Sequence, residues 1–187
     1  IGQFGVGFYS AFMVSDKVEV VTRKAGEEQA WKWASDGKGQ FVIEESECAG
    51  RGTTVTVHLK QDENEFLEDS RTRLIVKKYS DHIGIPILLG EGDNAETINT
   101  GSSLWTRPKK DITQEQYKEF YHHVGHTFDE PWVTIHNTVE GIVSYTSLLF
   151  IPTTPPFDLF HPDRKTNVRL YVKRVFITDN CEGLIPS

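Results

Sequence analysis

The sequence has few of the residues that build disulfide scaffolds, zinc sites or membrane spans. Its 187 residues include two cysteines, Cys48 and Cys181, which lie far apart and form no CxxC pair. A disulfide framework or a structural zinc site is therefore not expected, and a reducing compartment such as the cytoplasm suits the chain best. No apolar run approaches the roughly 18 residues of a membrane helix, and no signal-peptide pattern is present. We expect a globular chain with no membrane partner.

Basic residues are also scarce relative to acidic ones. The chain has 27 Asp and Glu against 20 Lys and Arg, which gives a formal net charge of -7. Such a chain would repel nucleic acids unless its basic residues gathered on one face, and they form only short pairs such as Lys109 with Lys110. No nucleic-acid partner is expected.

Two histidines at helical spacing raise the alternative of a metal pair. His122 and His126 are four residues apart, so they would share one face of a helix. No carboxylate or cysteine completes a known ligand pattern around them. We therefore favour a solvated helix face, and the sequence predicts no metal site.

Apolar periodicity divides roughly the first ninety residues into one helix, four strands and a helical stretch. Residues 6–14 are almost wholly apolar after three glycines and predict a buried helix, with a core strand as the alternative. Alternating runs at residues 17–24, 28–33, 40–43 and 53–59 predict an antiparallel meander with one wet face. Residues 63–83 suit one or two amphipathic helices packed on that sheet. The expected fold is α+β, a two-layer helix-on-sheet sandwich.

The second half of the chain predicts another unit. Residues 90–103 lose nearly all hydrophobic side chains and form the best linker candidate. Residues 112–124 predict a helix capped by Asp111 or Thr113, followed by strands at 143–151 and 168–177 on either side of a proline-rich loop. This α/β unit begins here without being completed. Because the chain also opens inside a glycine motif, we expect an internal piece of a longer protein.

One glycine pattern carries chemistry. Gly2, Gly5 and Gly7 form GxxGxG directly before the apolar helix. Glycines let the backbone bend tightly and approach a ligand, and the amides at a helix start favour phosphate. The pattern is neither a Walker A loop, since no Gly-Lys-Ser/Thr follows, nor the dinucleotide GxGxxG. By spacing alone, a purely structural turn is an equally good interpretation.

Longer strings narrow this choice. IGQFGVGFYSAFMVSDKVEVVTR at the start, and GRGTTVTVHL at residues 50–59, resemble the distal half of the ATP-binding domain in the ninety-kilodalton heat-shock chaperones. SLWTRPKKDITQEQYKEFYHHV, VEGIVSYTSLLFIPTTPPFDLF and VRLYVKRVFITD resemble consecutive blocks of that family's middle domain, in the right order. The resemblance covers essentially the whole chain. It implies a Bergerat-type ATPase sandwich followed by the start of an α/β middle domain.

The resemblance also implies domain boundaries and site residues. Residues 1–90 match the C-terminal half of the nucleotide-binding domain, 91–103 a linker, and 104–187 the N-terminal part of the middle domain. The glycine-rich segment matches backbone that closes over the triphosphate, Phe8 an aromatic that lines the nucleotide pocket, and Thr53 a threonine that reaches the adenine partly through water. The implied nucleotide contacts are Gly2, Gln3, Phe4, Gly5, Val6, Gly7, Phe8 and Thr53.

The family's catalytic residues have no counterpart in this sequence. Its general-base glutamate, magnesium-holding asparagine and adenine-reading aspartate would precede Ile1, and its catalytic arginine would follow Ser187. The resemblance thus implies an ATP- and Mg²⁺-dependent chaperone that acts on client proteins as a homodimer. The chain alone is expected to show no ATPase activity and no sub-millimolar nucleotide affinity, because phosphoryl transfer needs metal, positioned water and charge stabilisation together.

Three alternatives remain open at this point. A gyrase- or MutL-type ATPase shares the superfamily, but the acidic balance and the middle-domain blocks argue against it. A non-enzymatic interaction module would suit a decayed or truncated copy. In the second half, Trp105 and Phe157 are candidates for an exposed partner surface, although core packing is favoured because large aromatics are usually buried.

Overall fold

The chain forms two compact units, which are taken separately here. A computed structural model describes residues 5–157, 161 and 167–181. Contacts between residues divide the chain into Ile1–Leu74 (unit 1) and Ile75–Ser187 (unit 2). The domain boundaries at residues 90 and 103 that the resemblance implies stay a prediction. No helix in the described ranges is long and apolar enough to cross a bilayer.

Unit 1 is built around one antiparallel sheet. A 3-10 helix η1 (Val6–Ser10) runs into the short helix α1 (Ala11–Val14), and four strands follow: β1 (Ser15–Arg23), β2 (Ala30–Ser35), β3 (Phe41–Ser46) and β4 (Gly52–Leu59). All four predicted strands and the helical conformation of residues 6–14 are thereby confirmed. The prediction that this helix is buried is wrong, because neither η1 nor α1 has a buried residue. After the sheet come η2 (Asn64–Leu67) and α2 (Asp69–Tyr79), which continues into unit 2.

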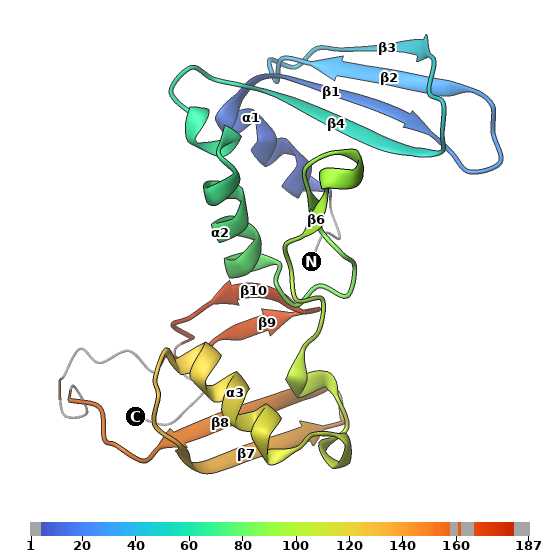
Figure 1. Ribbon diagram of the computed structural model, residues 1–187. Helices are drawn as coiled ribbons and strands as arrows, with labels where there is room; N and C mark the ends of the chain where they lie inside the picture. Colours follow the sequence, from blue (N-terminus) through green and yellow to red (C-terminus); the bar gives the residue numbers. More distant parts are fainter. Residues whose placement is uncertain (1–4, 158–160, 162–166, 182–187) are drawn as a thin grey trace. The chain divides into compact units, whose positions relative to one another are not determined.

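The strand order corrects the predicted meander. The sheet runs β3-β2-β1-β4, so β4 pairs with β1 and not with β3 (Figure 1). This order centres the sheet on β1, whose Val18 is fully buried. In the β1–β4 register, Val18 lies opposite Val57 and Val20 opposite Val55, so apolar side chains meet across the strands. A linear reading of alternating runs gives strand positions but not the order in which they pair.

The two faces of this sheet differ sharply in character. Side chains alternate along a strand, and the register aligns them across the sheet. One face, called the apolar face, carries Val18, Val20, Thr22, Trp31, Trp33, Ser35, Phe41, Ile43, Glu45, Thr53, Val55 and Val57. The opposite face, called the charged face, carries Lys17, Glu19, Val21, Arg23, Lys32, Val42, Glu44, Thr54, Thr56 and His58. The prediction of a single wet face is wrong: the charged face is solvated, but Phe41 and Ile43 on the apolar face are also largely exposed.

Unit 2 contains a helix, three strand pairs and short 3-10 turns. Its elements in chain order are β5 (Leu88–Leu89), η3 (Gly92–Asn94), β6 (Glu96–Thr97), η4 (Leu104–Thr106), η5 (Lys109–Asp111), α3 (Gln114–Gly125), β7 (Pro131–Val139), β8 (Tyr145–Pro152), β9 (Leu170–Val172) and β10 (Val175–Thr178). Antiparallel pairs join β5 with β6, β7 with β8, and β9 with β10. The described part of the chain is therefore a mixed α and β structure.

Helix α3 and the β7–β8 hairpin make the main packed layer of unit 2 (Figure 1). Thr113 caps the helix: its hydroxyl accepts from the Gln116 amide, and the Gln116 side chain accepts from the Thr113 amide. The predicted helix and one of its two candidate caps are confirmed. Buried Tyr117 and Tyr121 face the hairpin, where Tyr121 packs on Phe150 with ring centroids 5.4 Å apart.

Two strand predictions in unit 2 need correction. Strand β7 was not predicted at all, although it forms the longest pairing of the unit. The run at residues 168–177 was expected as one strand, but it is the β9–β10 hairpin. Its turn lies at Lys173 and Arg174, both with positive φ. A two-residue turn of this kind usually contains Gly or Asn, so its basic residues gave no signal in the sequence.

Candidate functional site

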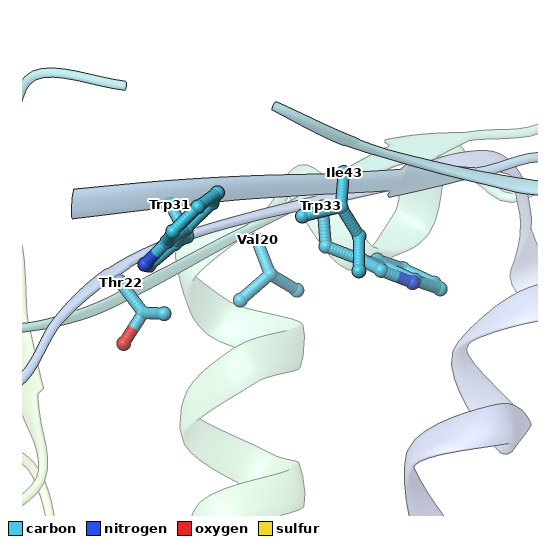
Figure 2. Close-up of a pocket in the computed structure, with 5 residues that line it drawn as sticks. All are labelled: Val20, Thr22, Trp31, Trp33 and Ile43. Carbon is cyan, nitrogen blue, oxygen red and sulfur yellow. The ribbon is translucent and has the colours of Figure 1, made fainter. Parts of the chain in front are cut away.

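A shallow hollow on the apolar face of unit 1 is the candidate site. It is lined by Val20, Thr22, Trp31, Trp33 and Ile43, and has a volume of about 420 Å³. Figure 2 shows these side chains extending from the same side of the sheet. Three strands supply them, because Trp33 lies between Val20 of β1 and Ile43 of β3 in the register. A nearly apolar lining with one hydroxyl suits the flat ring of a small molecule.

Thr53 lies on the same face, directly beside one lining residue. It is the register partner of Thr22, and the two hydroxyl oxygens are 2.8 Å apart. The Thr22 hydroxyl also lies 3.3 Å from the carbonyl oxygen of Gly52, to which it donates. Because that donation uses the Thr22 proton, Thr53 donates to Thr22 and keeps lone pairs free to accept from a ligand or a water. The predicted adenine-contacting residue is thus at the rim of the hollow.

Phe8 and the short helical segment cover another part of the apolar face. The ring of Phe8 packs edge-on against Trp33 at 5.7 Å, and Phe12 packs against Trp33 at 6.5 Å. A Cβ at Gly37 would lie 2.8 Å from the ring of Phe12, so the β2–β3 turn must be glycine there. Phe8, which packs on the apolar face from η1, and Thr53, which lies on that face in β4, are therefore on the same side of the sheet.

The glycine segment is described only from Gly5 onward. Gly5 has φ of 66°, a left-handed conformation that favours glycine, and it immediately precedes η1. A Cβ at Gly5 or at Gly7 would meet no atom within 4 Å, so packing demands neither glycine. Val6 follows Gly5 and is largely exposed. The other predicted contacts, Gly2, Gln3 and Phe4, lie outside the described residues.

The charged face carries a row of ion pairs across all four strands. Glu19 is at its centre, 2.7 Å from His58 Nε2 on β4, 3.1 Å from Lys17 and 3.1 Å from Lys32 on β2. Lys32 reaches on to Glu44 of β3 at 3.4 Å. Hydrogen bonds from His58, then Lys17 and Lys32, lower the pKa of Glu19 to about 2. This face is therefore a solvated ionic surface and has no lining suited to an apolar ring.

A metal site finds no support in the described residues. No three His, Cys, Asp or Glu among them come close enough to hold a metal ion. His122 instead lies on α3 with its Nε2 donating to the Asp129 carbonyl oxygen at 2.8 Å. His126 ends the same helix in a left-handed conformation.

The two residues considered for a partner surface lie in different surroundings. Trp105 is half-buried in an aromatic cluster, with its ring 4.6 Å from His82 and 4.7 Å from Tyr171. Phe157 is fully exposed, beyond the end of β8. The assignment of either residue to a partner surface stays a prediction.

Sequence reasoning missed the lining of the hollow. Trp31 and Trp33 stood in a predicted strand, yet neither was named as a site residue. The signal was present: the two tryptophans are two residues apart, so they share one face, and Val18, Val20 and Thr22 repeat the same spacing. What the sequence could not supply was the β1–β2 register that joins both sets.

Comparison with known proteins places these observations in a family. The family model described as Hsp90 protein matches residues 90–187. Among curated proteins, the chain is 61% identical over 187 residues to the chaperone protein HtpG of Paramagnetospirillum magneticum, and 61% identical over 188 residues to that of Rhodospirillum rubrum. It is 58% identical over 187 residues to the chaperone protein HtpG of Roseobacter denitrificans.

These matches span the whole chain but only part of each relative. Each of the three alignments covers 100% of this chain and 30% of the relative. The chain thus spans about 30% of the length of the curated relatives it matches. The resemblance noted in the sequence is confirmed over its full extent, including the first 89 residues that the family model does not reach.

Proposed function

Because the chain belongs to the Hsp90 family, we propose that it forms part of an ATP-dependent molecular chaperone. The names of its relatives, all chaperone proteins, support this function. Within the proposal, unit 1 contributes one wall of a nucleotide pocket, and the region after residue 103 belongs to the middle domain. The family match that begins at residue 90 supports a change of region near the proposed linker at 91–103.

The observation that carries the nucleotide proposal is the shared face of Phe8 and Thr53. An adenine ring needs an apolar wall and at least one polar group that reads its edge. The hollow of Trp31, Trp33 and Ile43 supplies the wall, and the Thr22–Thr53 hydroxyl pair lies at its rim. The Thr53 hydroxyl donates to Thr22, so its lone pairs are free to accept from adenine directly or from a bridging water.

The glycine segment is the proposed phosphate side of the pocket. Gly5 adopts the left-handed turn that leads into η1, and neither Gly5 nor Gly7 is required by neighbouring atoms. Glycines that packing does not demand fit a backbone that closes on a ligand. We propose that Gly2, Gln3, Phe4, Gly5, Val6 and Gly7 contribute amides to the triphosphate.

A pair of adjacent threonines tests the pocket. Thr53 lies on the apolar face and Thr54 on the charged face of the same strand. In the intact protein, Thr53→Val should weaken ATP binding about 5- to 15-fold, the loss expected for one hydrogen bond. Thr54→Val should leave the affinity within about twofold of wild type. Calorimetric titration with ATP and Mg²⁺ measures both.

A third variant separates ligand contact from local structure. Thr22→Val removes the hydroxyl that holds Thr53 but leaves the Thr53 hydroxyl in place. If Thr53 contacts the nucleotide, Thr22→Val should weaken binding less than Thr53→Val does. Wild-type affinity in Thr53→Val, with an unchanged thermal melt, would refute the proposed adenine contact.

The proposal assigns catalysis and metal binding to residues outside this chain. The described residues offer no cluster for Mg²⁺, so no step of hydrolysis is derived from them. The 187-residue chain by itself should show no ATPase activity and no sub-millimolar affinity for ATP. Clear ATP turnover by this chain would contradict that assignment.

Client binding and homodimer formation are proposed for the intact protein. Its chaperone activity is tested by its ability to suppress aggregation of a heat-denatured reporter enzyme, with and without ATP. Phe157→Ala tests the exposed partner residue, because Phe157 is fully exposed and its removal should not affect folding. Unchanged suppression by a folded Phe157→Ala variant would remove Phe157 from the client surface.

A further inference from the structure

The segment proposed as a linker is bound closely to the chain that precedes it. Residues 90–103 are called the strap, and residues 96–103 of it run antiparallel to residues 81–89 within unit 2. Strand β6 pairs with β5, and the Ile98 amide continues the pairing by donating to the Ile87 carbonyl oxygen at 2.9 Å. Further along, the Gly101 amide donates to the Asp81 carbonyl oxygen at 2.9 Å, and His82 Nδ1 donates to the Ser102 carbonyl oxygen at 2.8 Å.

A buried carboxylate holds the far end of the strap. Asp81 is 4% exposed, and its Oδ1 accepts from the Thr100 amide at 2.8 Å, the Thr100 hydroxyl at 2.9 Å and Lys77 Nζ at 2.9 Å. Burial alone would raise the pKa of Asp81, but the hydrogen bonds from Lys77 and Thr100 outweigh it and lower that pKa. One carboxylate oxygen thus ties the strap to the last turn of α2.

A buried amide holds the middle of the strap. Asn99 is 7% exposed; its Oδ1 accepts from the Ile87 amide at 2.9 Å, and its Nδ2 donates to the carbonyl oxygens of Ile83 and Ile85 at 3.0 Å each. The Asn99 side chain thus supplies hydrogen bonds that a neighbouring strand would otherwise supply, because residues 83–87 form no regular strand pairing. Its loss would remove the partners of three backbone groups, those of Ile83, Ile85 and Ile87.

Apolar burial contributes little to the closed strap. Ile98 is its one buried hydrophobic side chain, whereas Asn99 and Ser103 are buried and polar. Segments with few apolar contacts open locally at a lower free energy than a packed core does. The two ends are also built to turn: Gly90 has φ of 102° and Gly101 has φ of 67°, and a Cβ at Gly90 would lie 2.9 Å from the Asn94 carbonyl oxygen.

We propose that residues 90–103 form a strap that can detach from the chain before it. The hydrogen bonds of Asp81, called the latch, and those of Asn99, called the pin, hold the strap in its closed state. Closed, the strap fixes the path of the chain from β5 to η4. Open, these 14 residues become a flexible tether whose ends lie roughly 20 Å apart on average. Opening would occur while α3 and the β7–β8 hairpin stay folded, because the hydrogen bonds of the latch and the pin lie within residues 77–100. The ion pair that the latch makes with α3 is long, at 4.0 Å between Asp81 Oδ2 and His123 Nε2.

Amide hydrogen exchange of the intact protein tests the latch. In Asp81→Asn, the amides of Ile98, Thr100 and Gly101 should exchange roughly tenfold to a hundredfold faster, because charged hydrogen bonds are lost. Amides in α3 and β7 should keep their wild-type rates. Asp93→Asn removes the same charge from the exposed part of the segment and should change none of these rates.

A milder variant distinguishes local release of the strap from unfolding of the whole of unit 2. Thr100→Val removes the hydroxyl bond but keeps the amide bond to Asp81, so the same amides should accelerate by a smaller factor. Unchanged exchange at Thr100 and Gly101 in Asp81→Asn would overturn the latch. Equal acceleration of the strap, α3 and β7 in both variants would overturn release as a local event. Neither result depends on nucleotide binding, so the strap and the proposed function fail or succeed independently.

Discussion

The two units contain aromatic residues in different surroundings. In unit 1, the apolar face displays Trp31, Phe41 and Ile43, which are 44%, 64% and 57% exposed. In unit 2, Trp105, Phe120, Tyr171 and His82 close on one another, with ring centroids 4.6–6.2 Å apart. Large side chains thus lie on an exposed face in unit 1, whereas these four rings of unit 2 pack on one another.

Buried polar groups follow the same division. Among the described residues, five of the six buried polar ones lie in unit 2, and His136, for example, is 5% exposed. Its Nε2 donates to the Trp105 carbonyl oxygen at 3.1 Å, and its Nδ1 accepts from the Tyr117 hydroxyl at 2.7 Å. Buried polar groups with satisfied hydrogen bonds favour a single packing arrangement of the side chains around them. The difference teaches that unit 2 is organised by internal contacts, whereas unit 1 leaves much of its apolar face exposed.

The largest expected effect comes from exchanging tryptophan for alanine in each unit. Trp105→Ala removes the centre of the aromatic cluster and should lower the free energy of unfolding of unit 2 by about 3 kcal/mol. Trp31→Ala should cost unit 1 about 1 kcal/mol or less, because 44% of that side chain is already exposed. Urea unfolding, with hydrogen exchange to assign each transition to its unit, measures both.

A control for this comparison lies within unit 2. Trp132 is 73% exposed, so Trp132→Ala should leave the stability of unit 2 within about 1 kcal/mol of wild type. Equal losses from Trp105→Ala and Trp31→Ala would remove the contrast between a closed core and an open face.

A smaller effect is expected from a single hydroxyl in the core of unit 2. Tyr117→Phe keeps the ring but removes the donor to His136 Nδ1, which leaves a buried acceptor unpaired. The free energy of unfolding should fall by about 1–2 kcal/mol. Tyr145→Phe, on the exposed end of β8, removes the same group and should change stability by less than about 0.5 kcal/mol. Equal losses of unfolding free energy in the two variants would show that the hydrogen bond from Tyr117 to His136 does not contribute to the stability of unit 2.

The sequence predicted the strands of unit 1 because each alternates cleanly. By spacing alone, Val18, Val20 and Thr22 lie on the same side of one strand, and Trp31 and Trp33 lie on the same side of the next strand. The sequence alone does not show that both sets line one hollow. That depends on the register of β1 with β2, which is set by turn lengths and by contacts between residues far apart in the chain. The position of Thr53 beside Thr22 was likewise beyond a linear reading, although Thr53 itself was named from the family resemblance.

The strap shows the opposite limit of sequence reasoning. Its composition, rich in Gly, Asn, Ser and Thr, predicted a flexible linker, because such residues bury little apolar area. The structure instead satisfies these polar groups with part-buried hydrogen bonds: Asn99 bonds to Ile87, and Thr100 bonds to Asp81. Polar composition indicates a loop only where the polar groups find no partners within the protein. Partners at a distance of 12 to 19 residues give no periodic signal.

The smallest expected effect concerns the charged face of unit 1, and it is seen best as a titration. The folded-state pKa of Glu19 is about 2, below the ordinary 4.5, because His58, Lys17 and Lys32 bind the ionised carboxylate. A lowered pKa means that the contribution of Glu19 to stability is present above pH 4.5 and is lost as the pH falls from 4.5 towards 2.

His58→Gln should raise the pKa of Glu19 back towards 4.5, whereas Thr54→Val on the same face should not move it. Carboxyl carbon chemical shifts, followed by NMR between pH 2 and 6, measure that pKa directly. Because the pairs are exposed, the accompanying change in stability should be slight. If His58→Gln left the pKa unchanged, the charged face would be a set of independent surface charges and not a row centred on Glu19.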